Sequence, residues 1–151
     1  MDQDWGRRIV IDRSIDRTVS DVIQLMGREG FELVTQLDVR GRLQERLGKD
    51  LRRYFILEFS NPELTLTALR QDLDVGAVLP TNVAIYELAD QETAVAVEEP
   101  LAGLDFDRIW RRERPDLAAV AIEMEDRLAR VLDALPRLSQ PPAVPGPQTG
   151  V

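Results

Sequence analysis

Hydrophobic and polar residues alternate along the chain with two periods, and the period predicts the type of each element. Runs with a period of two residues predict strands, and runs with spacings of three and four residues predict helices. The predicted strands span residues 8–12, 31–38, 53–59, 82–88 and 93–99. The predicted helices span residues 18–30, 39–48, 62–73 and 116–135. This order predicts an α+β domain with one sheet of about five strands and helices packed on it.

Several of these predicted helices carry recognisable start or stop residues. Thr18, with Asp21 three residues later, resembles an N-cap arrangement, and Gly30 fits a left-handed helix stop. Asn61 is expected to cap the third helix, because its side-chain oxygen can accept a hydrogen bond from a free amide of the first turn. Pro62 fits the first helical position, where no backbone donor is needed.

The third strand and the last helix have the strongest apolar patterns. Residues 53–59 are apolar on both faces, which indicates a central strand covered on both sides. The last helix has an apolar stripe from Leu117 to Leu135, and it either covers the sheet or pairs with a second subunit. We therefore expect a single domain over residues 1–138 with a long amphipathic C-terminal helix. Residues 139–151 contain four Pro and two Gly and no charge, which predicts a disordered tail.

Composition and charge narrow the possible chemistry. The 151 residues include no cysteine and no histidine, so disulfides, thiolate nucleophiles and Cys/His metal sites within the chain are excluded. The commonest general acid–base residue is therefore missing. A net charge of −8 opposes binding to nucleic acid or to an anionic membrane, and neither partner is expected. The chain has no apolar run long enough to span a bilayer and no secretory signal, so a cytoplasmic location is expected.

Two turns on either side of the third helix are the first candidate site. Ser60, Asn61, Thr81 and Asn82 offer two hydroxyl groups, two amides and the free N–H groups of a helix start. Such groups suit an anion or a carbonyl oxygen, so these four residues are the predicted ligand-binding residues. The alternative is that they serve only as caps and turns.

A series of short motifs surrounds these turns. In chain order they are Gly30-Phe31, Asp38-Val39, Asn61-Pro62 and Leu79-Pro80 followed by Asn82. Their order resembles the DUF302 family, over roughly residues 8 to 98. The resemblance implies a compact α+β domain that pairs as a homodimer, in a family whose biochemical role is unsettled. The family's two cysteines align with Ser60 and Thr81, so this chain cannot carry out thiol chemistry at those positions.

Three further groups of residues have both a functional and a structural interpretation. Trp110 with Arg111 and the neighbouring arginines is typical of a subunit contact, or Trp110 covers the end of the sheet. A basic run either holds a phosphate or an acidic partner, or it is the solvated face of a short helix. A set of carboxylates either holds a hard cation or lies on a solvated acidic surface. The basic run is Arg40, Arg42, Arg46, Lys49, Arg52 and Arg53, and the carboxylates are Asp12, Asp38, Glu87, Glu98 and Glu99.

Two functions from different classes follow from these observations. No metal or cofactor is assigned to either, and the second function leaves room for a borrowed cofactor. The first is a non-catalytic module that binds a small molecule, an anion or a protein and acts as a homodimer. It is favoured because thiol and imidazole are both absent. The second is a thiol-independent enzyme that uses hydroxyl, amide and carboxylate groups at the two turns, with no assigned catalytic residue. A carboxylate or arginine converging on Ser60 and Thr81 would favour the enzyme. A third possibility is that the Arg-rich surface and the tail stabilise a partner.

Overall fold

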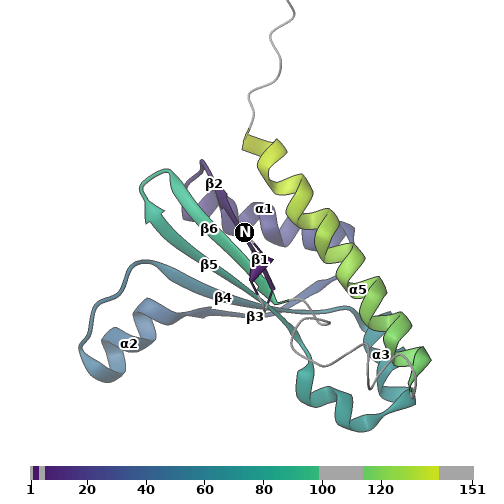
Figure 1. Ribbon diagram of the computed structural model, residues 1–151. Helices are drawn as coiled ribbons and strands as arrows, with labels where there is room; N and C mark the ends of the chain where they lie inside the picture. Colours follow the sequence, from purple (N-terminus) through teal and green to yellow (C-terminus); the bar gives the residue numbers. More distant parts are fainter. Residues whose placement is uncertain (1, 4–5, 99–113, 140–151) are drawn as a thin grey trace, which may run out of the picture.

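The computed structural model describes residues 2–3, 6–98 and 114–139 of the chain (Figure 1). The strands are β1 (Asp2–Gln3), β2 (Gly6–Ile11), β3 (Glu32–Asp38), β4 (Tyr54–Ser60), β5 (Thr81–Ala89) and β6 (Glu92–Glu98). The helices are α1 (Ile15–Arg28), α2 (Val39–Leu47), α3 (Pro62–Gln71) and α5 (Pro115–Ala134), with 3₁₀ helices η1 (Leu73–Val78) and η2 (Leu135–Ser139). All strand pairs are antiparallel, in the order β1-β2-β6-β5-β4-β3. The predicted α+β domain with one sheet is confirmed, and β1 is an additional two-residue strand.

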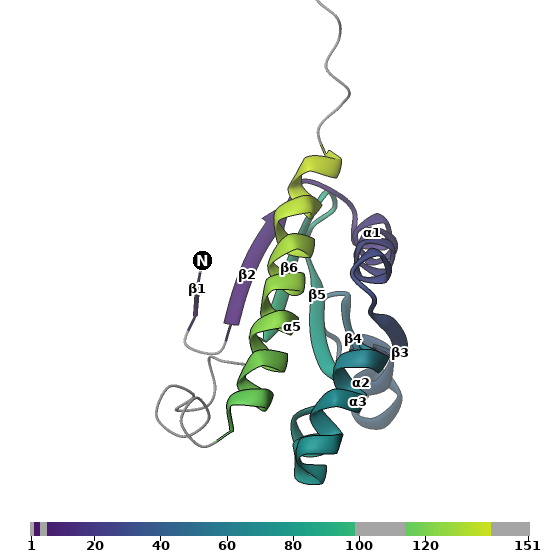
Figure 2. The same cartoon turned by 90° about the vertical axis from the view of Figure 1, so that its right-hand side faces the viewer.

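One face of the sheet carries the hydrophobic core. Alternate side chains of β4, β5 and β6 point to this face and pack with the apolar stripes of α1 and α5. Leu57, Ile85 and Val95 from the strands are buried there with Met26 and Leu128 from the helices. Figure 2 shows α5 in front of the sheet, with α1 beside it. The long C-terminal helix therefore covers the sheet of its own chain.

The start of α3 and the end of α1 follow the sequence prediction. The side-chain oxygen of Asn61 accepts a hydrogen bond from the backbone amide of Leu64, and Pro62 is the first residue of α3. Gly30 has φ of 83°, the left-handed conformation that glycine adopts without a steric penalty. Both positions therefore act as the helix signals predicted for them.

The start of α1 differs from the prediction. The helix begins at Ile15, after Ser14, and Thr18 lies inside it rather than at its cap. The Thr18 hydroxyl donates to the carbonyl of Ser14, a bond that a threonine within a helix can form. Ile15 is fully buried in the core, and this tertiary packing extends the helix toward the N-terminus.

The environment of β4 differs from the expected coverage on both faces, and the neighbouring strand β3 is exposed. All seven residues of β3 are exposed, and β3 is an edge strand with a bulge between Leu33 and Thr35. β4 buries Leu57 against the helices, whereas Tyr54 and Ile56 on its other face are only half-buried. Within the described residues, β4 is therefore covered on one face and not on both.

The third helix is shorter than predicted. It ends at Gln71, because the side chain of Asp72 accepts from the amide of Asp74 and starts the 3₁₀ helix η1. Leu73 lies in η1 and is exposed, and Leu66 of α3 is exposed as well. Neither leucine belongs to the hydrophobic core.

Two further predictions concern the C-terminal tail and membrane-spanning helices. Of the predicted tail, 139–151, the structure describes only Ser139, as the last residue of η2. No helix in the described part of the chain is long and apolar enough to cross a bilayer.

Candidate functional site

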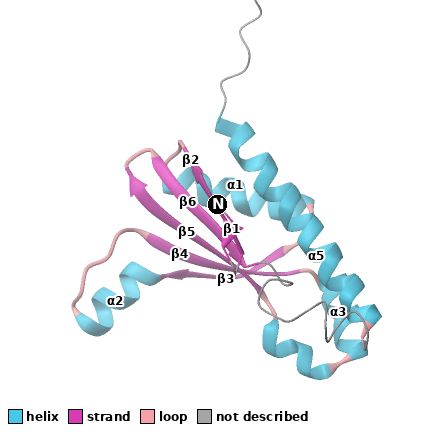
Figure 3. Ribbon diagram, viewed as in Figure 1, coloured by secondary structure: helices cyan, strands magenta, loops and turns pink. Residues whose placement is uncertain are grey.

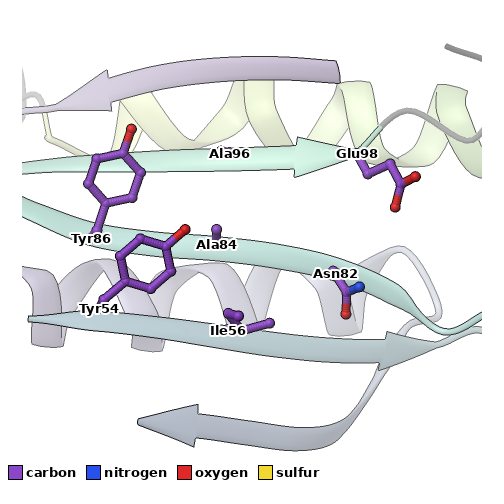
Figure 4. A pocket seen from close by; sticks show the side chains of 7 residues that line it. All are labelled: Tyr54, Ile56, Asn82, Ala84, Tyr86, Ala96 and Glu98. Atoms are coloured by element: carbon purple, nitrogen blue, oxygen red, sulfur yellow. The ribbon is translucent and has the colours of Figure 1, made fainter. Parts of the chain in front are cut away.

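The face of the sheet opposite the helices carries a shallow groove (Figure 4). Its side chains alternate with the core residues along β4, β5 and β6, and therefore point away from the core. The strand register places Ile56 opposite Ala84, and Ala84 opposite Ala96, so these three residues form one row across the sheet. The groove has a volume of about 460 Å³ and is lined by Tyr54, Ile56, Asn82, Ala84, Tyr86, Ala96 and Glu98.

The floor of the groove is apolar and low because its central side chains are small. Ala84 and Ala96 end at Cβ, whereas the rings of Tyr54 and Tyr86 rise at one end (Figure 4). Covering apolar surface is worth roughly 25 cal/mol for each Å² removed from water. The floor therefore favours contact with an apolar group.

The two tyrosines form a wall at that end of the groove. Their rings are nearly parallel, with 6° between the planes and 5.2 Å between the centroids. The hydroxyl of Tyr86 accepts a hydrogen bond of 2.7 Å from Nε of Arg8. The guanidinium carbon of Arg8 lies 5.8 Å from the centroid of the same ring. These contacts hold Tyr86, and Tyr86 in turn supports Tyr54.

Burial of Tyr54 has an electrostatic consequence. It raises the pKa of the Tyr54 hydroxyl above its usual value of 10.0, and the charge that Tyr86 would carry on ionising raises it further. The charged phenolate is disfavoured because the partly buried oxygen loses solvation. Tyr54 is therefore protonated and uncharged at neutral pH and can donate a hydrogen bond.

Asn82 and Glu98 lie at the other end of the groove (Figure 4). Both side chains are exposed. The amide of Asn82 offers donors and an acceptor, whereas the ionised carboxylate of Glu98 only accepts. This end therefore suits a group that donates hydrogen bonds or carries positive charge.

Asn61, one of the four predicted ligand-binding residues, lies inside the protein and not in the groove. It is 1% exposed. Its oxygen accepts from the amide of Leu64, and its nitrogen donates to the carbonyl of Glu29 over 3.4 Å. Nη1 of Arg127 donates to the same carbonyl over 3.0 Å. Asn61 thus joins the start of α3 to the end of α1, and the Glu29 carbonyl connects both to α5.

The remaining predicted ligand-binding residues do not meet in one pocket. Phe59 pairs with Thr81 across β4 and β5, so the two turns lie at the same end of the sheet. Oγ of Ser60 is 3.4 Å from the hydroxyl of Thr65, and Thr81 is buried. In the described residues, neither hydroxyl has a hydrogen bond to a carboxylate or a guanidinium group. Asn82 alone of the four lines the groove, and a ligand-binding role for the other three stays a prediction.

The other candidates are dispersed. Trp110 and Arg111, the predicted subunit contact, lie within residues 99–113 and so fall outside the described part of the chain. Among the carboxylates, Asp38 accepts from the amide of Gly41 and caps α2, whereas Glu98 lines the groove. Among the residues that the structure describes, no three or more His, Cys, Asp or Glu side chains are grouped so as to hold a metal ion.

Sequence reasoning missed most of the groove. Tyr54 and Ile56 stand out as apolar residues on a second strand face, a pattern that predicts coverage on both sides, whereas in the structure both residues line the groove. The available signal was the even-numbered positions of β5 and β6, where Ala84, Tyr86 and Ala96 alternate with the core residues. Small and aromatic side chains at such positions leave a hollow beside a wall once the strands pair.

Comparisons with known proteins agree on one family. The family model described as "Domain of unknown function DUF302" matches residues 8–135. The fold is similar to the crystal structure of an uncharacterized conserved DUF302 protein from Bacillus stearothermophilus, with 26% sequence identity and a TM-score of 0.71. That similarity covers 85% of this chain and 96% of the other. No curated protein matches the sequence.

Proposed function

The chain belongs to the DUF302 family, and we propose that it is a non-catalytic module that binds a small molecule in the groove on the sheet face opposite the helices. The observation that carries the proposal is the composition of this groove. An apolar floor at Ala84 and Ala96 lies between a tyrosine wall and a polar end. Binding sites for small molecules commonly combine mostly apolar walls with a few polar groups that orient the ligand.

The two ends of the groove define the class of ligand. Ala84 and Ala96 leave room for a flat apolar body, which can contact the exposed edge of the tyrosine pair. Asn82 and Glu98 favour a donor or cationic group at the other end. We therefore propose a ligand with a planar apolar body and an amine or amide head group.

The contacts at the two turns favour this module over the thiol-independent enzyme. The enzyme requires an acid or base beside a reactive hydroxyl. The hydroxyl of Ser60 lies near that of Thr65, and Thr81 is buried on the core side of β5. These positions support a structural role for both hydroxyls.

Three indole compounds of different charge test the proposal by thermal unfolding. Tryptamine, indole and indole-3-acetate share one ring and carry a cationic, a neutral and an anionic form respectively. A ligand at ten times its dissociation constant stabilises the folded state by about 1.4 kcal/mol. For a chain of this length, that raises the melting temperature by about 4 °C. We expect tryptamine to produce the largest shift.

Two matched variants test whether tryptamine stabilises the protein by binding in the groove. Ala84→Leu fills the floor of the groove, whereas Ala89→Leu adds the same side chain at the exposed end of β5. The stabilisation by tryptamine is expected to disappear in Ala84→Leu and to persist in Ala89→Leu. An equal shift in both variants, or no shift of the wild type with any compound at millimolar concentration, contradicts the proposal.

A further inference from the structure

The outer edge of β3 is open in the described part of the chain. β3 is the last strand of the sheet in the order β1-β2-β6-β5-β4-β3, and all seven of its residues are exposed. Between Glu32 and Asp38 the strand contains neither a charge nor a proline. Natural edge strands usually carry such residues, because an unpaired row of N–H and C=O groups readily pairs with another strand. β3 therefore keeps the capacity to add a strand.

The bulge of β3 determines which part of the edge can extend the sheet. The register with β4 shifts between Leu33 and Thr35 and then runs without a break from Thr35 to Asp38. In this regular part, Leu37 pairs with Ile56 and is 39% exposed. An added strand would place a side chain beside Leu37 and cover it, because cross-strand neighbours lie in contact. The regular part of the edge thus offers both backbone groups and an apolar side chain.

A basic segment, defined as residues 39–53, follows this part of the edge directly. It contains six basic side chains and two acidic ones, whereas the whole chain has a net charge of −8. Figure 3 shows α2, which belongs to this segment, beyond the ends of β3 and β4 and away from the other helices. α2 contacts β4, and its apolar residues Val39 and Leu43 are half-buried. The segment is therefore held to its own sheet, while most of its basic side chains are exposed.

Part of the positive charge of the basic segment is not paired. Arg40 lies 3.0 Å from Asp50, so its charge is neutralised locally. Arg46 and Lys49 are exposed, and neither forms an ion pair with any residue that the structure describes. Because the rest of the chain is acidic, a negatively charged partner is attracted to this segment and repelled elsewhere. The charge therefore identifies the sign of the partner and the place where its charged end lies.

From these observations we infer that an extended segment of another protein, acidic at its N-terminal end, adds to β3 as a further antiparallel strand. Its backbone pairs with the edge at residues 35–38, one of its apolar side chains covers Leu37, and its acidic residues lie along the basic segment. Recognition through backbone hydrogen bonds and alternate side chains is a common mode of peptide binding. This goes beyond the ligand groove, because strand addition does not require a bound ligand.

The direction of the added strand follows from the sheet and from the charge. All strand pairs of the sheet are antiparallel, and antiparallel pairing is slightly more stable than parallel pairing. An antiparallel strand places its N-terminal end beside the C-terminal end of β3, where the basic segment begins. The acidic residues of the partner therefore precede its alternating apolar residues.

Three peptides with a fluorescent label at the C-terminus test this inference by fluorescence anisotropy with the full-length chain. The first, DEDETVTVTV, has the proposed charge and alternation, and the second, KRKRTVTVTV, reverses the charge. The third has the sequence of the first, with every backbone amide of its TVTVTV half N-methylated. N-methylation removes the hydrogen-bond donors of the added strand and leaves its charge unchanged. We expect saturable binding of the first peptide only.

Two double variants with the same change of net charge test whether the acidic end binds the basic segment. Arg46→Glu/Lys49→Glu reverses the two unpaired charges of this segment. Arg17→Glu/Arg70→Glu makes the same change at exposed positions of α1 and α3. The first variant is expected to bind DEDETVTVTV about fivefold more weakly than the wild type, and the second to bind it as tightly. All four positions are exposed, so both variants should keep the unfolding midpoint of the wild type.

Amide hydrogen exchange identifies the edge and separates this binding from the groove. With saturating DEDETVTVTV, those amides of residues 35–38 that do not bond to β4 should exchange about tenfold more slowly. The methyl resonance of Ala84, in the floor of the groove, should not shift.

Four outcomes overturn the inference. They are no binding of DEDETVTVTV at about 1 mM, equal binding of the two peptides of opposite charge, equal binding of DEDETVTVTV and its N-methylated form, and equal affinities of the two double variants. A further contradicting result is slower exchange of residues 35–38 when the protein concentration is raised without peptide, because a second copy of the chain would then occupy the edge.

Discussion

The rings of Tyr54 and Tyr86 stack across β4 and β5 on the sheet face opposite the helices, with centroids 5.2 Å apart and nearly parallel planes. They pair directly in the strand register, so the backbone fixes their approach. Nε of Arg8 donates a hydrogen bond of 2.7 Å to the hydroxyl of Tyr86. The stack is therefore preorganised, and a ligand meets it without having to order the side chains first.

Alkaline titration should detect this stack directly, because the chain contains only these two tyrosines. The pKa of Tyr54 is raised by burial and by Tyr86. We expect the absorbance of tyrosinate at 295 nm in Tyr86→Phe, where Tyr54 alone titrates, to rise at higher pH in the folded chain than in urea. A midpoint equal to that of the unfolded chain would show that Tyr54 is fully solvated.

The raised pKa of Tyr54 determines how the free energy of unfolding changes at alkaline pH. A raised pKa means that folded Tyr54 holds its proton more tightly than unfolded Tyr54 does. Its contribution to the free energy of unfolding is fully present below about pH 10 and is lost as the pH rises through the folded pKa. Tyr54→Phe should lessen this alkaline loss, as measured by urea unfolding between pH 8 and 11.

The carboxylate of Glu98 should set the preference for a cationic head group. Glu98→Gln removes the charge and keeps the shape of the side chain. We expect the affinity for tryptamine to fall by about 1 kcal/mol, or roughly fivefold, because exposed ion pairs contribute at most about that much. The affinity for indole should not change. Isothermal titration calorimetry measures both, and Glu92→Gln, at the other end of β6, should leave both unchanged.

Alanine substitutions at Asn61 and Asn82 should have different effects on the free energy of unfolding. Asn61→Ala removes the cap of α3 and a hydrogen bond to the Glu29 carbonyl, with an expected loss of about 2 kcal/mol in the free energy of unfolding. Asn82→Ala changes an exposed side chain, and the expected change is within about 0.5 kcal/mol. Urea unfolding measures both. A larger loss of stability in Asn82→Ala than in Asn61→Ala would assign the structural role to the turn that contains Asn82.

The ion pair of Asp16 and Arg53 should make stability depend on acid and salt. Arg53 donates to both oxygens of Asp16, at 2.6 and 3.0 Å, and this hydrogen bonding lowers the pKa of the carboxyl. The stabilisation is present above the unfolded pKa, about 3.9, and is lost as the pH falls through the folded pKa.

The variant Asp16→Asn tests this dependence. It should be slightly less stable than the wild type at pH 7, and the difference should vanish in acid. It should also shrink in 0.5 M salt, because both groups are near the surface and are screened. A difference that persists at pH 2 would assign the effect to something other than the ion pair.

The order of elements was predictable because it depends on local signals. Asn61, Pro62 and Gly30 mark helix ends through their own backbone chemistry, and these predictions agree with the structure. The start of α1 was not predictable from Thr18, because the burial of Ile15 in the core overrides the local cap signal.

The groove was not predictable for a related reason. The apolar residues Tyr54 and Ile56 indicate that both faces of β4 avoid water, but periodicity does not say what covers each face. Ala84 and Ala96 become a floor only when the register of β5 and β6 sets them side by side. Such cross-strand neighbours depend on tertiary pairing, which no local pattern in the sequence fixes.

The most direct measurement is an NMR titration of the full-length chain, labelled with ¹³C at alanine and isoleucine methyl groups, with tryptamine. If the groove is a ligand site, the methyl resonances of Ala84, Ala96 and Ile56 shift in a saturable way. The methyl resonances of Ile85, which lies on the core face of β5, should not shift. Saturable shifts confined to other residues, or no saturable shift at millimolar tryptamine, would contradict the proposal that this face of the sheet binds a small molecule.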